Sequence, residues 1–159
     1  PHMNEGRIAC HNSHLRVIKQ FLETNEDRCI IFEDDLQSSY DMNKLNMLLK
    51  KTIYNIPMDC DILYLGYCWE RCHKIIPVNA YINKAYAPLC RHAYSINRKA
   101  AQIILDKTSI MYNNGDQMYK ELIVNGYING YLAKHVLFKQ NREEYGSELN
   151  NNDSLPLCY

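Results

Sequence analysis

The chain has 159 residues, of which 47% are hydrophobic, and its 18 lysine and arginine side chains balance 18 aspartate and glutamate side chains. A chain of this length can bury a core as one domain, so we expect residues 4–159 to form it and residues 1–3 to be an expression-tag remnant. Because no run of like charge could track a phosphate backbone, the composition argues against a nucleic-acid partner. No apolar stretch reaches the ~18 residues of a membrane span.

The seven cysteines are an odd number, and several lie within apolar runs, where a reduced thiol packs as a small hydrophobic group. We therefore expect reduced cysteines and a cytoplasmic location. Cys68, Cys72 and His73 are possible zinc ligands, but no second cysteine or histidine pair stands nearby in the sequence to complete four ligands. A surface loop with incidental thiols is the favoured interpretation.

The first helix is predicted from the spacing of its apolar residues. Ile8, Leu15, Ile18 and Leu22 recur at the period of an amphipathic helix. Asn4, which stands ahead of them, is a suitable N-cap.

Strands and helices alternate along the rest of the chain. Short apolar runs predict buried strands at residues 29–32, 61–66 and 92–96, the first of them buried on both faces. Apolar spacing and stop signals predict helices at residues 41–56, 98–107 and 116–125. Residues 67–88 have a weak pattern, which we interpret as loops and an edge hairpin. The alternation predicts an α/β fold with a mainly parallel sheet flanked by helices.

Three adjacent acidic residues, Glu33, Asp34 and Asp35, follow the first predicted strand. Their carboxylates repel one another unless a divalent cation such as Mg²⁺ or Mn²⁺ neutralises them. The carboxyl ends of strands border the ligand crevice in open α/β sheets, so a nucleotide diphosphate could share the cation. Alternate residues of an extended chain point the same way, which makes Glu33 and Asp35 the expected pair. A solvated acidic loop or a helix N-cap is the alternative.

Two segments, residues 6–15 and 30–36, resemble the core signature of glycosyltransferase family 25, which includes bacterial lipooligosaccharide galactosyltransferases and procollagen galactosyltransferases. Shorter segments resemble later parts of the family in the same order, at residues 61–66, 92–96, 99–101, 116–117 and 138–140, and at Ser147. The resemblance implies an A-type, Rossmann-like glycosyltransferase fold. Family members carry a strand–helix–strand unit ahead of the segment that begins at Gly6. We therefore expect either a fragment of a longer protein or a truncated homologue, which obtains that unit from a second copy or a partner domain or has lost donor binding.

The resemblance also implies a reaction. Glu33 and Asp35 would hold Mn²⁺ (or Mg²⁺) together with the diphosphate of a UDP-sugar, and the metal would act as a Lewis acid on the leaving UDP. A hexose, galactose or glucose, would pass in one inverting displacement to a hydroxyl of a glycan or of a hydroxylated protein side chain. Asp116 matches an acidic position of the family and is the candidate general base, with a helix N-cap as an equal alternative.

Further residues are candidates for donor or acceptor binding. Ser13 and His14 could bond the sugar or phosphate from the first helix, although a role in fixing that helix is favoured. His92 could line the acceptor cleft, or it could be a satisfied structural histidine. The resemblance adds Asp34, Gln117 and Gln140 to this set, without an individual role for Gln140.

Other protein classes explain the acidic residues less well. A receiver domain needs an aspartate at the end of its central strand, where this chain has Leu65 and Gly66. A haloacid-dehalogenase phosphatase needs its nucleophilic aspartate where Glu33 stands. The remaining alternative is a catalytically inactive sugar-binding or assembly module, for which thirteen tyrosines and Trp69 provide rings that stack on sugars.

Overall fold

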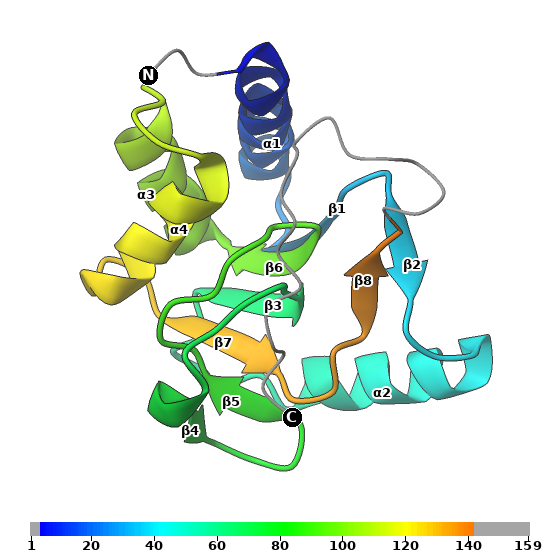
Figure 1. Cartoon of the computed structure of the whole chain (residues 1–159). Coiled ribbons are helices and arrows are strands. Elements are labelled where there is room, and N and C mark those ends of the chain that lie inside the picture. The colour runs from blue at the N-terminus through cyan, green and yellow to red at the C-terminus, as the bar shows by residue number, and fades with distance from the viewer. Residues whose placement is uncertain (1–3, 142–159) are drawn as a thin grey trace.

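A computed structural model describes residues 4–141 and shows a central sheet between two layers of helices (Figure 1). The helices are α1 (Glu5–Glu23), α2 (Met42–Tyr54), the short 3-10 helix η1 (Cys72–Lys74), α3 (Arg98–Thr108) and α4 (Gly115–Val124). The strands are β1 (Arg28–Phe32), β2 (Leu36–Ser38), β3 (Ile62–Gly66), β4 (Ile76–Pro77), β5 (Ile82–Lys84), β6 (Ala93–Asn97), β7 (Gly130–Ala133) and β8 (Phe138–Gln140).

The main sheet has the strand order β1-β6-β3-β7-β5-β4. The predicted α/β class with flanking helices is confirmed. The prediction of a mainly parallel sheet is wrong, because β3 and β7 form the single parallel pair and the other neighbours are antiparallel. β1 and β3 run in the same direction, but β6 inserts between them and runs opposite to both. Hydrophobic runs indicate strands without indicating their direction, so this insertion is invisible in the pattern.

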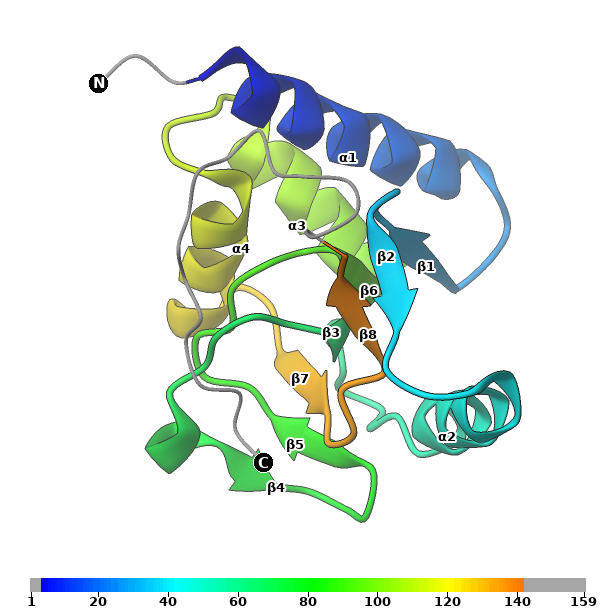
Figure 2. The same cartoon turned by 45° about the vertical axis from the view of Figure 1, so that its right-hand side comes forward.

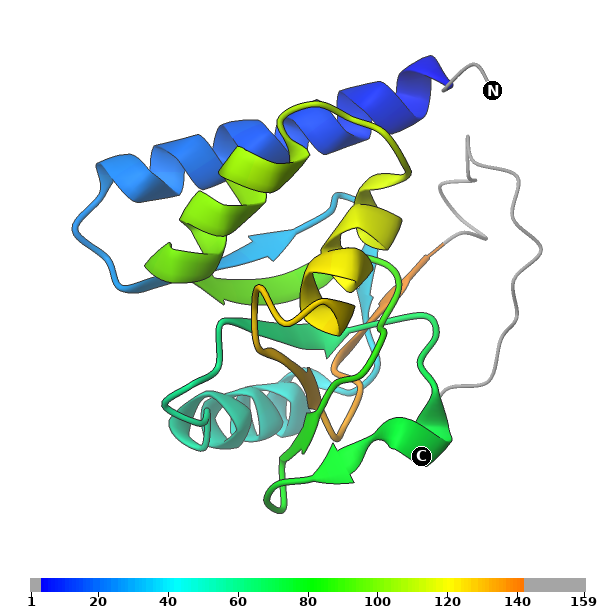
Figure 3. The same cartoon turned by 90° about the vertical axis from the view of Figure 1, so that its left-hand side faces the viewer.

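The two faces of β3 belong to two hydrophobic clusters. Ile62 and Tyr64 pack on the side of α1, α3 and α4, and Leu63 and Leu65 pack on the opposite side with Leu45 of α2. Figure 3 shows the three helices on one side of the sheet and α2 on the other. All five residues of β3 are buried, which confirms the prediction of a buried strand there.

β1 is an edge strand, so the prediction that it is buried on both faces is wrong. Ile31 is 5% exposed and belongs to the cluster on the α1 side, whereas Ile30 is 38% and Phe32 48% exposed. A short apolar run therefore marks a strand here without marking a central position. The edge position leaves the residues that follow Phe32 at the border of the sheet.

All four predicted helices are confirmed, and α1, α2 and α3 each begin at a side-chain cap. Asn4 accepts a hydrogen bond from the Gly6 N–H at 2.8 Å, and Asp41 accepts one from Lys44 at 3.0 Å. The α3 cap, Asn97, lies at the end of β6 and leads the chain directly from strand to helix. The edge hairpin predicted within residues 67–88 is also present, as β4 and β5. Within residues 4–141, no helix is long and apolar enough to cross a membrane.

A separate two-stranded ribbon, β2 with β8, lies beside the main sheet (Figure 2). Its antiparallel register pairs Leu36 with Gln140. Gly66 at the end of β3 permits the close approach of β8, because a Cβ atom there would collide with the His92 ring and lie 2.5 Å from the Phe138 carbonyl oxygen. The ribbon thus returns the end of the described chain to the residues that follow β1.

Candidate functional site

The acidic residues form a turn between the sheet and the ribbon. Glu33 continues the pairing of β1, because its backbone N–H donates to the carbonyl oxygen of His92 at 2.9 Å. Asp34 is exposed at the turn, whereas Glu33 and Asp35 are partly buried. The turn therefore directs two of the three carboxylates toward protein rather than solvent.

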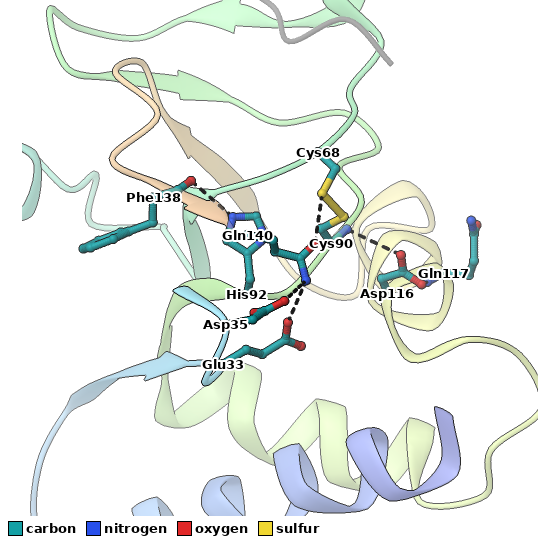
Figure 4. Close-up of a disulfide and its surroundings, with 9 residues drawn as sticks. All are labelled: Glu33, Asp35, Cys68, Cys90, His92, Asp116, Gln117, Phe138 and Gln140. Carbon is teal, nitrogen blue, oxygen red and sulfur yellow. Dashed lines mark hydrogen bonds between the residues drawn. A yellow bond between two sulfur atoms is a disulfide. The ribbon is translucent and has the colours of Figure 1, made fainter. Parts of the chain in front are cut away.

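Gln140 connects these two carboxylates, as Figure 4 shows. Its Nε2 donates to Asp35 Oδ2 at 3.0 Å and to Glu33 Oε2 at 3.3 Å. The positive end of the amide dipole lies between the two acids and reduces their repulsion. Glu33 and Asp35 thus lie together in the structure, in the arrangement that their alternation predicts.

Asp35 has an oxygen that the protein leaves unsatisfied. Its Oδ1 is buried and finds no hydrogen-bond partner within residues 4–141. Burial, and then the negative charge of Glu33, raise the pKa of Asp35 above its ordinary value. A bound cation would satisfy this oxygen and offset the repulsion. The pair therefore fits Mg²⁺ or Mn²⁺, which proteins often hold through one or two carboxylates together with water and phosphate oxygens.

A buried hydrogen-bond chain fixes Glu33 from the side of α1. Glu33 Oε1 lies 3.0 Å from His14 Nε2, and His14 Nδ1 lies 2.8 Å from the hydroxyl of Tyr94. Burial alone would raise the pKa of Glu33, but the hydrogen bond from His14 and the charge of Arg91 hold it below the ordinary value. Burial lowers the pKa of His14, so the imidazole is neutral at pH 7. The Glu33 carboxylate is ionised and oriented.

Cys10 and Arg91 lie behind this chain. Cys10 Sγ is 3.7 Å from Glu33 Oε1, and Arg91 Nη2 is 3.9 Å from the same sulfur. Arg91 is 6% exposed, and its guanidinium lies over the ring of Tyr119, 4.7 Å from the ring centroid. Within residues 4–141, no carboxylate comes within 4.0 Å of Arg91. Its positive charge therefore acts on Glu33 across the sulfur atom.

A disulfide between Cys68 and Cys90 borders the site. Cys68 Sγ lies 3.6 Å from Gln140 Oε1, and the Cys90 N–H points to Asp116 Oδ2 at 3.5 Å, the outer limit of a hydrogen bond. The expectation of reduced cysteines is not confirmed for this pair. Its members are 22 positions apart, Cys68 inside the weakly patterned segment 67–88 and Cys90 just after it, and spacing alone does not reveal which thiols meet.

Asp116 lies in the first turn of α4, whose N-cap is Asn114. Asp116 is therefore not the cap itself, the alternative that its position in the sequence allows. Figure 4 places its carboxylate beside the disulfide and shows the Gln117 side chain pointing away from the acidic pair. The Gln117 amide oxygen accepts a hydrogen bond from Lys120 instead.

Two other candidates have structural partners. Ser13 is exposed, and its hydroxyl donates to the carbonyl oxygen of Ala9 in its own helix at 3.0 Å. His92 is 1% exposed, and its Nε2 lies 3.2 Å from the carbonyl oxygen of Phe138. Of the candidate binding residues, His14 and Gln140 have side chains that contact the acidic pair.

Cys10, Arg91 and Tyr94 belong to the site, although no sequence pattern predicts them there. Cys10 stands four positions before His14, so both lie on one face of α1, and this spacing is the one signal in the sequence that could have found it. Arg91 precedes β6 and Tyr94 lies within it, and neither has a comparable spacing signal, although Tyr94 belongs to the segment 92–96 that resembles the family. Their roles come from packing against residues distant in the sequence.

Comparison of the sequence with protein families identifies a class of enzyme. The model of glycosyltransferase family 25 (LPS biosynthesis protein) matches residues 1–119, three quarters of the chain. The chain therefore belongs to glycosyltransferase family 25. The match includes the acidic turn, His92 and Asp116, and it ends before β7, β8 and Gln140. No individual curated protein matches the chain.

Proposed function

We propose that this chain is a metal-dependent glycosyltransferase that moves a hexose from a UDP-sugar to a hydroxyl of a glycan or of a hydroxylated protein side chain. Membership of the family supports the class of reaction. The unsatisfied Oδ1 of Asp35, beside a second carboxylate, is the observation that supports a metal and a diphosphate donor.

Glu33 and Asp35 would hold the cation, Mn²⁺ or Mg²⁺. When bound, the cation supplies Lewis-acid stabilisation of the charge that develops on the leaving diphosphate. His14 holds Glu33 in place through its 3.0 Å contact, so the carboxylate needs little reorganisation when the site is loaded. Before a cation binds, the amide of Gln140 keeps the two carboxylates together.

Asp116 is the proposed general base. The acceptor oxygen forms a bond to the anomeric carbon while the bond from that carbon to the diphosphate oxygen breaks, and UDP leaves with the electron pair. The proton of the acceptor hydroxyl passes to a carboxylate oxygen of Asp116. The nearby N–H of Cys90 helps to orient this carboxylate.

Calorimetric titration of UDP in the presence of Mn²⁺, and again in EDTA, tests the proposal. We expect binding with Mn²⁺ and none with EDTA, and we expect Asp35→Asn to abolish it. Asp27→Asn is the matched control, because Asp27 is exposed before β1 and its substitution removes the same charge.

Equal UDP affinity in wild type and Asp35→Asn would remove the acidic turn from the mechanism. Binding of a sugar that is indifferent to EDTA, without binding of UDP, would instead identify a non-catalytic sugar-binding module.

A further inference from the structure

A second cluster of potential metal ligands adjoins the acidic pair and is chemically different from it. Cys10, His14 and Glu33 each offer one ligand atom, and these three atoms lie within 4.8 Å of one another. Thiolate, imidazole and carboxylate are the three ligand types that zinc takes in proteins, whereas Mg²⁺ and Mn²⁺ prefer oxygen. We propose that these three residues form a binding site for Zn²⁺, distinct from the site proposed for the hard cation.

Two of the three ligand-to-ligand distances agree with one face of a zinc tetrahedron, and the third, between His14 Nε2 and Cys10 Sγ, is at most 4.8 Å. Zinc bonds of about 2.0 Å to nitrogen and oxygen and about 2.3 Å to sulfur separate N from O by roughly 3.3 Å and S from O by roughly 3.5 Å. The structure has His14 Nε2 at 3.0 Å and Cys10 Sγ at 3.7 Å from the same oxygen, Glu33 Oε1. Small side-chain rotations therefore suffice to bind the ion.

The backbone explains why the three side chains converge. Cys10 and His14 are separated by four positions in α1, so both project from one face of the helix. Glu33 meets them from the end of β1, which packs below that helix. Two ligands from one helix and a third from a strand end give a rigid arrangement without a dedicated loop.

The surroundings orient the ligands as in known zinc sites. The hydroxyl of Tyr94 bonds His14 Nδ1 at 2.8 Å, which leaves Nε2 directed at Glu33 and available to a metal. Arg91 Nη2 lies 3.9 Å from Cys10 Sγ, where it can donate a hydrogen bond to a metal-bound thiolate. Binding shifts the imidazole proton of His14 from Nε2 to Nδ1, where it is donated to the hydroxyl of Tyr94. It also replaces the thiol proton of Cys10 with Zn²⁺ and releases that proton to solvent.

Glu33 is shared between the two sites through different oxygens. Oε1 contacts Cys10 and His14, and Oε2 contacts Gln140 beside Asp35. Three protein ligands leave a fourth position, which water or an oxygen of a bound ligand would take. The Glu33 side chain is 21% exposed, so an ion can reach the cluster.

Cobalt is the spectroscopic probe for this site. The whole chain is titrated with Co²⁺ without reductant, so that Cys68 and Cys90 remain joined and cannot act as thiolate ligands. We expect one equivalent to produce a thiolate-to-cobalt charge-transfer band and the intense visible bands of tetrahedral Co²⁺, both removed by Zn²⁺. The Cys10→Ser variant should lose the charge-transfer band and bind at least about tenfold more weakly.

Cys29→Ser is the matched control, because Cys29 is the other half-buried free cysteine of the described chain, and it should keep the full spectrum. Asp35→Asn should also keep the spectrum while losing Mn²⁺-dependent UDP binding, which separates failure of this site from failure of the proposed function. A wild-type chain without the charge-transfer band, or a Cys10→Ser variant with an unchanged band, would overturn the zinc site.

A second measurement needs no variant. Alkylation of the native protein by iodoacetamide, followed by mass spectrometry of its peptides, should show that Zn²⁺ slows modification of Cys10 but not of Cys29. Mg²⁺ should protect neither residue. Equal protection of both cysteines, or of neither by Zn²⁺, would contradict the site.

Discussion

The side chain of Gln140 reaches Asp35 across 105 positions of sequence, with Nε2 at 3.0 Å from Oδ2. The same nitrogen lies 3.3 Å from Glu33 Oε2, so one amide serves both carboxylates. The Gln140→Glu variant would replace this donor with a third carboxylate. We expect it to unfold at lower urea concentration at pH 7, with a loss of about 1–3 kcal/mol.

Mn²⁺ should restore part of that lost stability, because a cation takes over the neutralising role of the amide. Gln37→Glu is the control for the chemical change, since Gln37 is exposed on the partner strand of the same ribbon. We expect its stability to change by about 0.5 kcal/mol or less. A Gln140→Glu variant as stable as Gln37→Glu would show that the amide does not hold the acids together.

The contact between Gln140 and Asp35 also shows how much of the structure the sequence can predict. The long helices and β3 are predictable because repeated apolar spacing and cap residues mark them independently of the rest of the chain. β2 and β8 have three residues each, too few for a periodic signal, and their pairing depends on the return of β7 to the sheet. Gln140 could thus be named from a family resemblance, but not placed against Asp35.

The acidic turn, too, has features that the sequence predicts and features that it does not. Alternation along an extended chain predicts that Glu33 and Asp35 share one side, because it depends on neighbouring residues alone. The contacts of Glu33 with Cys10 and His14 depend on how α1 packs over β1, which no local pattern encodes. Sequence therefore predicts that these two carboxylates lie together, and tertiary packing decides their surroundings.

Two buried tyrosines allow a matched test of the hydrogen-bond chain that holds Glu33. The hydroxyl of Tyr94 bonds His14, whereas the hydroxyl of Tyr64 is buried without a partner among the described residues. Removal of the Tyr94 hydroxyl should leave Nδ1 of the buried His14 imidazole without its hydrogen bond. We expect Tyr94→Phe to lower the free energy of unfolding by about 1–3 kcal/mol.

Tyr64→Phe should be neutral or stabilising, because it removes an unsatisfied polar atom from the core. Both tyrosines are fully buried, so the comparison cancels the effect of losing a hydroxyl as such. Urea unfolding of the two variants measures the difference. Equal losses in both variants would argue that the bond from Tyr94 to His14 contributes nothing to stability.

The Cys68–Cys90 disulfide should stabilise both the fold and the site. It closes a loop over a sequence separation of 22, which corresponds to about 3 kcal/mol in the chain-entropy model. The double variant Cys68→Ala/Cys90→Ala should therefore unfold at a clearly lower temperature. Because Cys68 Sγ contacts Gln140, the variant should also bind UDP and Mn²⁺ more weakly.

The single variant Cys29→Ala provides the control, since Cys29 is free and lies in β1 away from this loop. Thermal unfolding and UDP titration are to be run on both proteins. A double variant with wild-type stability would mean that the two thiols are not joined in solution. Lost stability with intact UDP affinity would show that the disulfide supports the loop but not the site.

The buried carboxylate of Asp61 predicts how stability depends on pH. Asp61 is 3% exposed and accepts hydrogen bonds from the Lys99 ammonium and from the Asn129 N–H, both at 2.8 Å. Burial alone would raise its pKa, but Lys99, Asn129 and then Asn97 outweigh burial and hold the pKa below the ordinary value. The ionised carboxylate thus joins the start of β3 to α3 and to the residue before β7.

The lowered pKa of Asp61 determines whether stability rises or falls with pH. A carboxyl group whose pKa is lower in the folded chain contributes stability above its unfolded pKa of about 3.9, and this stability is lost as the pH falls through the folded value. Asp61→Asn should be less stable than wild type at pH 7 by about 1–3 kcal/mol, and the difference should shrink below about pH 4. Urea unfolding at a series of pH values measures both, with Asp27→Asn as the exposed control. Parallel curves for wild type and Asp61→Asn down to about pH 2 would mean that ionisation of Asp61 is not linked to folding, because only a pKa that differs between the folded and unfolded chain makes the two curves converge.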